Sequence, residues 1–192
     1  DVPPYADAWV RDLDDDQVEA YAEMMEHLVA PFRGGDRARV AAEGLSTQPR
    51  PLAAVTARLG LGRFRVTQKA NPGDPNDVYR SERAEPNDWA MIGTHDTESI
   101  WACADAWAGG ERGRREAETL GRRLAASPEE TARLANDPTD LVHAKCADVF
   151  ASRAENVIVF FAEQFGCRER FNAPGTVGPR NWTLRAPSSR LE

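Results

Sequence analysis

Apolar positions recur with two different periods along this chain, and each period predicts a different kind of element. Residues 14–31 have helical spacing, because an acidic start at Asp14–Asp16 favours a helix N-terminus and Pro31 favours its end. The apolar positions of this predicted helix are Val18, Tyr21, Met25, Leu28 and Val29.

Four short segments have the composition of β-strands. They are residues 39–45, 63–68, 89–94 and 156–161, and the last is a continuous apolar run typical of a strand buried on both faces. The third segment places His95 and Asp96 at its C-terminal end.

Helical patterns separate these strands. Residues 51–59 place Leu52, Val55 and Leu59 on one face, and residues 97–107 form a second helical pattern. Residues 112–123 read as a solvated mixed-charge helical face. Ser127 opens another helix with a capping box, and residues 140–152 form a helix that buries its apolar side chains. Those buried side chains are Leu141, Val142, Val149 and Phe150.

The alternation of strands and helices predicts an α/β fold with a parallel sheet. Four strands fit an open doubly wound sheet or part of a (β/α)8 barrel. Residues 69–87 are expected to form a long loop, and residues 165–187 show no clear element. Neither phosphate-binding glycine motif follows any predicted strand, which removes the simplest nucleotide-binding interpretations.

Composition and charge narrow the class of protein. The 192 residues are 41% hydrophobic and 29% charged, with a net charge of -7, so we expect one globular segment over residues 1–192. The acidic balance argues against a nucleic-acid partner and suits a neutral substrate. No apolar run is long enough to span a membrane, and no signal peptide is visible. Three widely spaced cysteines favour reduced thiols in a cytoplasmic protein, with no metal or cofactor.

Two carboxylates lie at the ends of predicted strands, where a β/α barrel places its reactive groups. They are Glu43 in the first strand and Asp96 after the third. The plainer interpretation pairs Glu43 with Arg63 or Arg65, and makes Asp96 the cap of a helix that begins at Thr97. The functional interpretation makes one carboxyl a general acid and the other a stabiliser of positive charge, as glycoside cleavage requires.

Four stretches of the chain carry a resemblance to a known family, and they are Gly93–Thr97 and residues 42–47, 60–66 and 172–185. They resemble the 4-α-glucanotransferases, also called amylomaltases or disproportionating enzymes, of glycoside hydrolase family seventy-seven. Gly93-Thr94-His95-Asp96-Thr97 resembles the family's T-H-D segment. Residues 42–47 resemble its A-E-D-L-G segment, and residues 60–66 resemble the strand that follows it. Residues 172–185 resemble its N-x-P-G-T and N-W-x-x-R ending. The four matches fall in the family's order and cover residues 39–185.

The resemblance implies that this segment is the second half of a (β/α)8 TIM barrel, with about four β/α units. It implies that Glu43 is the general acid/base and that Asp96 stabilises the oxocarbenium-like transition state. It further implies that His95 and Asn172, with the turn of Pro174, Gly175 and Thr176, bind the sugar. Trp182 and Arg185 are expected to close the fold.

Two departures from the family pattern qualify this expectation. Gly44 stands where the family usually has Asp, and nothing here matches the R-x-D-H-like segment that carries the family's nucleophile. The implied enzyme transfers α-1,4-glucan segments to maltooligosaccharide acceptors by a retaining double displacement, with its nucleophile outside this chain. The implied partner is the N-terminal half of the same barrel, or a second copy bound through exposed edge strands. The alternatives are a non-catalytic glucan-binding remnant and another α-glucan barrel hydrolase.

Overall fold

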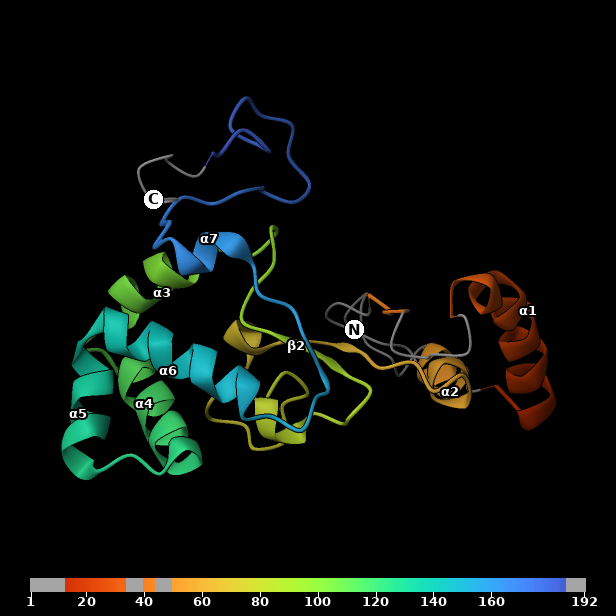
Figure 1. The fold of residues 1–192 in the computed structure, drawn as a ribbon, viewed down its shortest axis with the longest axis horizontal. Coiled ribbons are helices and arrows are strands. Elements are labelled where there is room, and N and C mark those ends of the chain that lie inside the picture. Colours follow the sequence, from red (N-terminus) through yellow and green to blue (C-terminus); the bar gives the residue numbers. More distant parts are fainter. Residues whose placement is uncertain (1–12, 34–39, 44–49, 186–192) are drawn as a thin grey trace, which may run out of the picture. The chain divides into compact units, whose positions relative to one another are not determined.

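The computed structural model describes residues 13–33, 40–43 and 50–185 (Figure 1). Contacts between Cα atoms divide these residues into two compact units. The smaller unit holds the described residues up to Phe64, with Glu85–Trp89 and Ala154–Asn156. The larger unit holds Arg65–Ala84, Ala90–Arg153 and the described residues from Val157 onward.

The smaller unit contains helices α1 (Asp15–Arg33) and α2 (Arg50–Arg58). Asp14 and Gln17 cap α1 reciprocally, because each side chain accepts a hydrogen bond from the other residue's amide, at 2.9 and 3.1 Å. The helix continues through Pro31, beyond its predicted end. Its buried face packs against α2 in a small apolar core. The core residues are Ala22, Val55, Leu59 and Leu61, with Leu13, Val18, Met25, Val40 and Ala42 packed against them.

Part of the predicted apolar pattern of the smaller unit is wrong. Tyr21, Leu28 and Leu52 are exposed, although their spacing suggested burial, while Val55 and Leu59 are buried as predicted. The exposed apolar residues of α1 lie on one face at helical spacing, and this face comprises Tyr21, Met24, Leu28 and Phe32.

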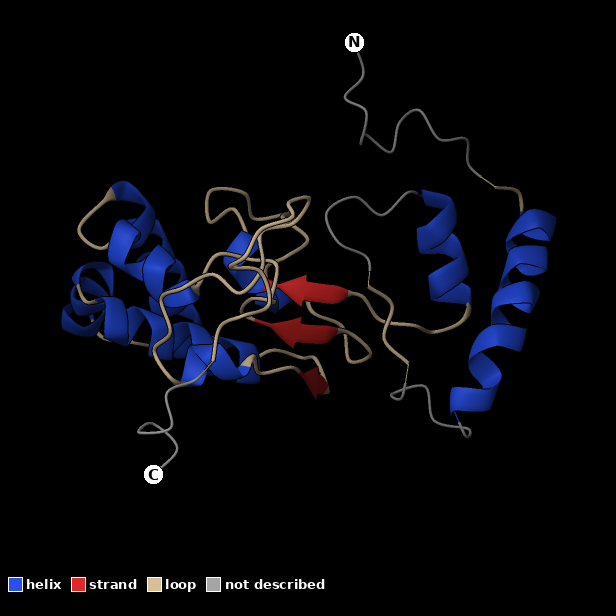
Figure 2. Cartoon of the chain, turned by 90° about the horizontal axis from the view of Figure 1, so that it is seen from above, coloured by secondary structure: helices blue, strands red, loops and turns tan. Residues whose placement is uncertain are grey.

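The sheet is parallel, as predicted. Its three strands follow the order β1 (Phe64–Val66), β2 (Trp89–Met91) and β3 (Asn156–Val157) (Figure 2). The hydrogen bonds from Trp89 N to Arg63 O and from Gln68 N to Ile92 O advance along both strands in the same direction. Those from Glu155 N to Pro86 O and from Ile158 N to Ala90 O do the same for β2 and β3. Ala42 forms a parallel bridge to Arg63. Within the described residues, this bridge is the observed part of the strand predicted at 39–45.

All three strands are shorter than predicted. The apolar run at residues 156–161 pairs only as far as Val157, and both strand residues are half-buried, so a strand buried on both faces was wrong. The run ends instead in a short helix, α7 (Phe161–Gln164).

Four further helices form the body of the larger unit: α3 (Ile100–Trp107), α4 (Glu111–Leu124), α5 (Pro128–Asn136) and α6 (Pro138–Phe150). The predicted capping box at Ser127 is confirmed, with Glu130 as its reciprocal partner. Phe150 was predicted to be buried but is exposed at the end of α6. The largest fully buried side chains in the core of this unit are Met91, Ile100, Leu141 and Val66.

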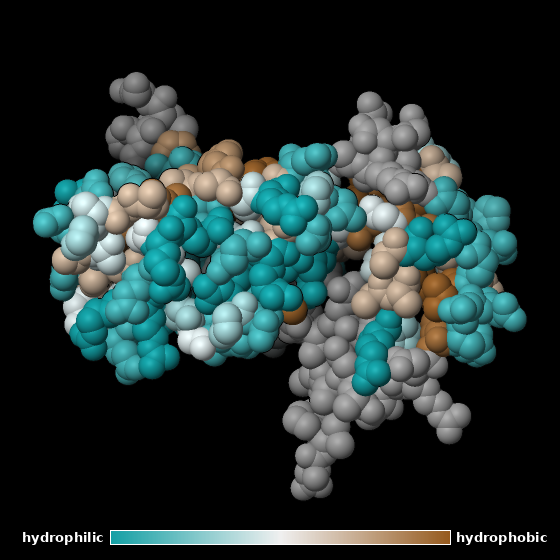
Figure 3. Space-filling model, turned by 90° about the horizontal axis from the view of Figure 1, so that it is seen from below, coloured by the Kyte–Doolittle hydropathy of each residue, from teal (hydrophilic) through white to brown (hydrophobic). Residues whose placement is uncertain are grey.

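The larger unit also buries charge. Glu116 of α4 and Lys145 of α6 are both at least 95% buried and form an ion pair of 2.9 Å. The expectation of a fully solvated α4 was therefore wrong for Glu116, although most of the unit's surface seen in Figure 3 is hydrophilic.

Residues 67–88 form the predicted long connection, with two short 3-10 turns at Thr67–Lys69 and Ser81–Arg83. The Ser81 hydroxyl and the Arg123 guanidinium both bind the buried Asp148 carboxylate, which fixes this connection to α4 and α6. None of the helices in the described residues combines the length and apolar character needed to cross a membrane.

Candidate functional site

The loop that follows β2 is shaped by two threonines. Thr97 Oγ accepts a hydrogen bond from Thr94 N at 3.0 Å and donates to Thr94 O at 2.9 Å, while Thr94 Oγ accepts from Asp96 N at 3.2 Å. These bonds end the strand ladder and make a tight turn, which presents His95 and Asp96 at the C-terminal end of β2.

Asp96 is not a helix cap. The N-cap of α3 is Ser99, whose hydroxyl oxygen accepts a hydrogen bond from Trp101 N at 3.2 Å and donates to Cys167 O. The plainer interpretation of Asp96 is therefore wrong, and its half-buried carboxylate is available for another purpose.

The C-terminal segment joins this loop through Asn172. The Asn172 side-chain amide donates to Asp96 Oδ1 at 2.6 Å, and the Asn172 backbone amide donates to His95 O at 3.1 Å. Arg170 donates to the backbone oxygen of Asp96 at 2.9 Å and to that of Asn172, also at 2.9 Å. The structure thus brings together three of the predicted site residues from sequence positions more than 70 residues apart.

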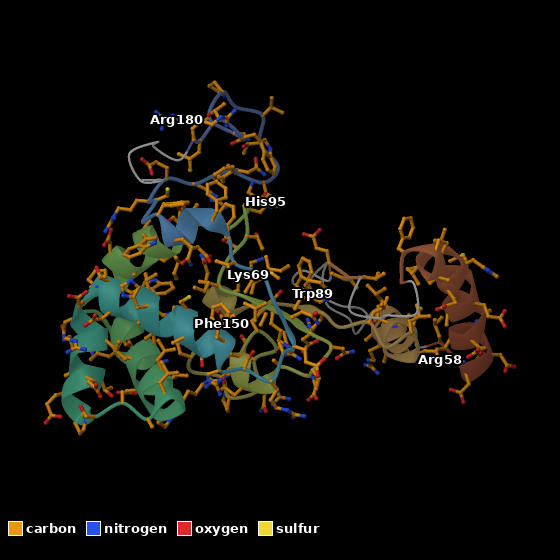
Figure 4. The ribbon with its side chains drawn as sticks, in the orientation of Figure 1. Arg58, Lys69, Trp89, His95, Phe150 and Arg180 are labelled. Atoms are coloured by element: carbon orange, nitrogen blue, oxygen red, sulfur yellow. The ribbon has the colours of Figure 1, made fainter. Side chains whose placement is uncertain are left out.

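His95 lies between the carboxylate and an aromatic ring. Its Nε2 is 3.5 Å from Asp96 Oδ1, and its ring packs at 4.9 Å against Trp182, tilted by 40°. Figure 4 shows His95 in the loop after β2, beside the C-terminal segment. The ring arrangement fixes the imidazole edge toward Asp96 while leaving 44% of its side chain exposed.

Trp182 belongs to this cluster, which the sequence did not predict. It is 55% exposed and has a φ of +63°, a left-handed conformation that is rare for a bulky residue. Its amide donates to Phe171 O at 3.0 Å, which anchors the strained position. Strained backbone conformations of this kind concentrate at functional sites. The positive φ of Trp182 is therefore what marks it as a site residue, and the sequence contains no pattern that predicts this φ.

The predicted Pro174–Thr176 turn is held by Asn181. Asn181 Oδ1 accepts from Ala173 N at 3.2 Å, and Asn181 Nδ2 donates to Thr176 O at 3.0 Å. Gly175 has a φ of +72°, which explains the need for glycine there. The three turn residues are exposed, so the turn stands next to the Asp96 cluster with its surface open to solvent.

A second carboxyl, Glu163 of α7, lies buried beneath the loop. Its Oε1 accepts a hydrogen bond of 2.9 Å from Gly93 N, three residues before Asp96. Burial raises the pKa of Glu163 to about 7, and the hydrogen bonds from the backbone amides of Gly93 and Phe160 oppose the rise in part. The signal in the sequence was an acidic residue within an apolar run, and it was missed.

Glu43 lies in the smaller unit. It is exposed and follows the Ala42–Arg63 bridge directly, at the side of β1 away from β2. His95, Asp96 and Asn172 are grouped in the larger unit.

The cluster has no resemblance to a metal centre. Within the described ranges, no group of three or more His, Cys, Asp or Glu side chains is placed to hold a metal ion. A cleft of about 660 Å³ lies elsewhere, between α4 and α5, and small residues such as Gly121 and Ala132 line it. None of the predicted site residues lines this cleft, so it is a gap in helix packing rather than the candidate site.

Comparisons with known proteins agree with this picture. The sequence matches the family model for 4-alpha-glucanotransferase over residues 4–190. The structure is similar to an amylomaltase from Streptococcus agalactiae in complex with acarbose, with a TM-score of 0.69 and 17% identity. The match covers 91% of this chain and 32% of that chain, so this chain spans about a third of the amylomaltase's length. At this identity the likeness shows the fold alone, which corresponds to part of a glycosidase-like TIM barrel. No curated protein matches the sequence.

Proposed function

Because the chain belongs to the 4-alpha-glucanotransferase family, we propose that it forms the C-terminal part of the catalytic barrel of such an enzyme. The enzyme transfers α-1,4-glucan segments to the 4-hydroxyl of an acceptor glucose or maltooligosaccharide. One observation carries the proposal: Asp96, His95 and Asn172 converge at the C-terminal end of a parallel strand, where barrel enzymes place their chemistry.

The proposed role of Asp96 is to stabilise the oxocarbenium-like transition state. The Asn172 amide holds its carboxylate by a short hydrogen bond, so the charge needs little reorganisation when positive charge develops on the sugar ring. His95, next to the carboxylate and half-exposed, is placed to hydrogen-bond the same ring.

Glu43 is proposed as the general acid/base. It would protonate the departing glycosidic oxygen and then take the proton of the incoming hydroxyl. Its exposure suits this exchange with solvent and substrate. A retaining mechanism also needs a nucleophilic carboxylate about 5 Å from the acid/base. We place that nucleophile outside these 192 residues, in the N-terminal half of the barrel.

Trp182 supplies the proposed apolar surface of the site. A pyranose ring presents C–H groups on its faces, and a half-exposed indole beside His95 offers a flat apolar surface to them. The Pro174–Thr176 turn, held by Asn181 on the same segment, is proposed to line the acceptor side. The similar amylomaltase is in complex with acarbose, which supports an oligosaccharide ligand for this chain.

The exposed apolar face of α1 supports the proposal that a further segment of the barrel packs against it. Tyr21, Met24, Leu28 and Phe32 form a continuous apolar stripe, which a helix normally buries. Among the residues that the structure describes, no strand pairs with the outer edge of β3 in the three-stranded sheet. We propose that the remaining barrel covers these surfaces. Self-association is the alternative, and light scattering on the isolated chain separates the two.

The test is disproportionation of maltotriose, measured as glucose release and as longer products. The 192-residue chain alone should be inactive, and it should become active when joined to the barrel segment that carries the R-x-D-H-like strand. Glucose release by the chain alone would refute the placement of the nucleophile. Glucan binding by the joined protein without turnover would favour a binding remnant, and net hydrolysis without transfer would favour a hydrolase.

A further inference from the structure

A buried carboxyl that the proposed mechanism does not use lies under the loop of His95 and Asp96. Glu163 is 93% buried in α7, and its Oε1 accepts the hydrogen bond from Gly93 N. Its backbone oxygen accepts a second hydrogen bond, of 2.6 Å, from Trp101 Nε1 of α3. Glu163 therefore connects three elements, the end of β2, α3 and α7, at one point.

Three side-chain oxygens converge on Gly93. A Cβ atom at this position would lie 2.5 Å from Gln68 Oε1, 2.6 Å from Thr97 Oγ and 3.1 Å from Glu163 Oε1. The space beside Gly93 is therefore filled by oxygens from a 3-10 turn, from the site loop and from α7. Any larger residue would displace them.

Gln68 has an acceptor that lacks a donor. Its Nε2 donates to Glu98 O at 2.7 Å, and this bond fixes the orientation of the amide. Among the described residues, no donor is placed to bind the buried Gln68 Oε1. A buried acceptor without a donor is costly, and a protonated carboxyl is a group that supplies one donor while keeping an acceptor oxygen.

We propose that Glu163 is a positioning residue, whose protonated carboxyl accepts the Gly93 amide and donates its proton to Gln68 Oε1, so that the loop bearing His95 and Asp96 is held in place. The importance of that loop rests on the proposed function, while the proton-sharing pair itself does not. Loss of the proton removes the donor and sets a negative charge against the carbonyl oxygen of Gln68. The 3-10 turn of Gln68 then loses its tie through Glu163 to the loop.

The surroundings of Glu163 favour the neutral form. Glu98 and Glu169 line the same small cavity, and the Cys103 thiol of α3 lies 3.7 Å from Gln68 Nε2. Arg170 of the C-terminal segment faces Glu98 at 3.8 Å, and Arg168 pairs with Asp105 at 2.6 Å. In the described part of the chain, no Lys or Arg forms an ion pair with Glu163, and its pKa of about 7 reflects burial above all. The tie should therefore loosen near neutral pH.

The direct test is NMR titration of the wild-type 192-residue chain. We expect the Glu163 carboxyl carbon and the Gly93 amide to shift together, with one midpoint near 7. A carboxyl carbon that titrates near 4.5, or a Gly93 amide that does not respond, would overturn the proposal. This measurement needs no glucan and no enzymatic activity, so its outcome is independent of the proposed function.

Variants then separate positioning from bulk stability. Glu163→Gln keeps an acceptor for Gly93 and a donor for Gln68 but cannot ionise. It should abolish the titration of the Gly93 amide. It should also slow the hydrogen exchange of the Gln68 backbone amide, which donates to Ile92 O, by about tenfold relative to wild type at pH 8. Glu163→Leu should accelerate that exchange at every pH. Glu169→Gln, which removes a carboxylate lining the same cavity, is the matched control and should leave the Gly93 titration in place. Equal exchange at pH 8 in wild type and Glu163→Gln would contradict the proposal.

In the joined, active protein, the same pair of variants reports on the loop. We expect kcat of wild type with maltotriose to fall about threefold or more above pH 7, and the Glu163→Gln variant to lack that fall. A decline that persists unchanged in Glu163→Gln would show that Glu163 does not position the loop. Absence of any turnover would instead count against the proposed function.

Discussion

The side-chain amide of Asn172 donates a 2.6 Å hydrogen bond to a carboxylate oxygen of Asp96, although 76 positions separate the two residues in the chain. A hydrogen bond to a charged acceptor is roughly twice as strong as a neutral one. It fixes both the orientation of the carboxylate and the start of the segment that carries the Pro174–Thr176 turn and Trp182. The carboxylate and the proposed sugar-binding surface are thus parts of one hydrogen-bonded unit.

Replacing Asn172 by Ala should reduce kcat/KM with maltotriose by about 10- to 100-fold in the joined protein, since a hydrogen bond to a charged group contributes about 1.5–3 kcal/mol. The loss should fall mainly on kcat, because an unheld carboxylate must reorganise in the transition state. Asn136→Ala, at the exposed end of α5, is the matched control and should change kcat/KM less than twofold. Equal effects of the two substitutions would remove Asn172 from the site.

The charge of Asp96, not its shape, is expected to matter. Asp96→Asn keeps the size of the side chain but removes the negative charge, so kcat should fall by about 100- to 1,000-fold, in the range found when a preorganised electrostatic group is lost. Binding of maltotriose, measured by calorimetry, should change only a few-fold. Asp105→Asn serves as the control, because Asp105 is an exposed carboxylate that pairs with Arg168 at 2.6 Å. A kcat above a tenth of wild type in Asp96→Asn would contradict the role of Asp96.

The indole of Trp182 should contribute to glucan affinity. Trp182→Ala is expected to raise KM for maltotriose by about 5- to 20-fold, since stacked aromatic contacts contribute about 0.5–1.5 kcal/mol beyond their buried area. Trp182→Phe should recover part of the affinity, because it retains a flat apolar ring. Phe150→Ala removes an equally exposed aromatic from the end of α6 and is expected to leave KM unchanged. If Trp182 only closes the fold, as expected from the sequence, Trp182→Ala would instead lower the melting temperature without a specific effect on KM.

The sequence predictions that the structure confirms are those with a local signal. They are the strand before Asp96, the capping box at Ser127 and the order of the last three predicted strands. Strand lengths were overestimated, because hydrophobic periodicity does not indicate where the backbone pairing between strands ends. The Thr97 hydroxyl bonds to both backbone groups of Thr94, the Thr94 hydroxyl accepts from Asp96 N, and these bonds end β2 early. Such competition between side chain and ladder is decided in three dimensions.

The parts of the site that the sequence missed depend on long-range contacts. Trp182 was expected to close the fold, and nothing in the residues around it indicated that its ring would meet His95. Glu163 lies two residues beyond the run predicted as a strand, in a segment without a predicted element, and only the turn of the chain into α7 buries it. The predicted burial of Tyr21 and Leu28 was wrong because helical spacing identifies an apolar face but does not show whether another element covers it.

The buried pair of Glu116 and Lys145 should be more costly to break than to replace. Glu116→Ala leaves Lys145, which is 4% exposed, without its partner, and should lower the free energy of unfolding by about 3 kcal/mol or more. The double substitution Glu116→Leu and Lys145→Met removes both charges and should be closer to wild type than either single change. Glu118→Ala, on the exposed face of the same helix, is the control. Urea denaturation of wild type, Glu116→Leu, Lys145→Met and the double variant completes the comparison, and additive losses in the double variant would show that the two residues are not coupled.

The contribution of Glu163 to the free energy of unfolding should fall as pH rises from about 4.5 to about 7. The pKa of Glu163 is about 7 in the folded chain against an ordinary value of 4.5, so between these values the folded state binds more protons than the unfolded state. By linkage, the free energy of unfolding then decreases with pH in that window and is level outside it. At about 1.4 kcal/mol per pKa unit, the total change is about 3 kcal/mol.

Other carboxylates titrate over the same range, so the measurable quantity is the difference between Glu163→Gln and wild type. That difference in free energy of unfolding, obtained from urea denaturation at constant ionic strength, should grow in favour of the variant by about 3 kcal/mol between pH 4.5 and pH 8. Glu169→Gln provides the matched comparison, since it removes an exposed carboxylate that lines the same cavity and should give a nearly flat difference. A flat difference for Glu163→Gln as well would mean that its carboxyl is ionised in the folded chain at neutral pH, and the shared proton with Gln68 would then be excluded.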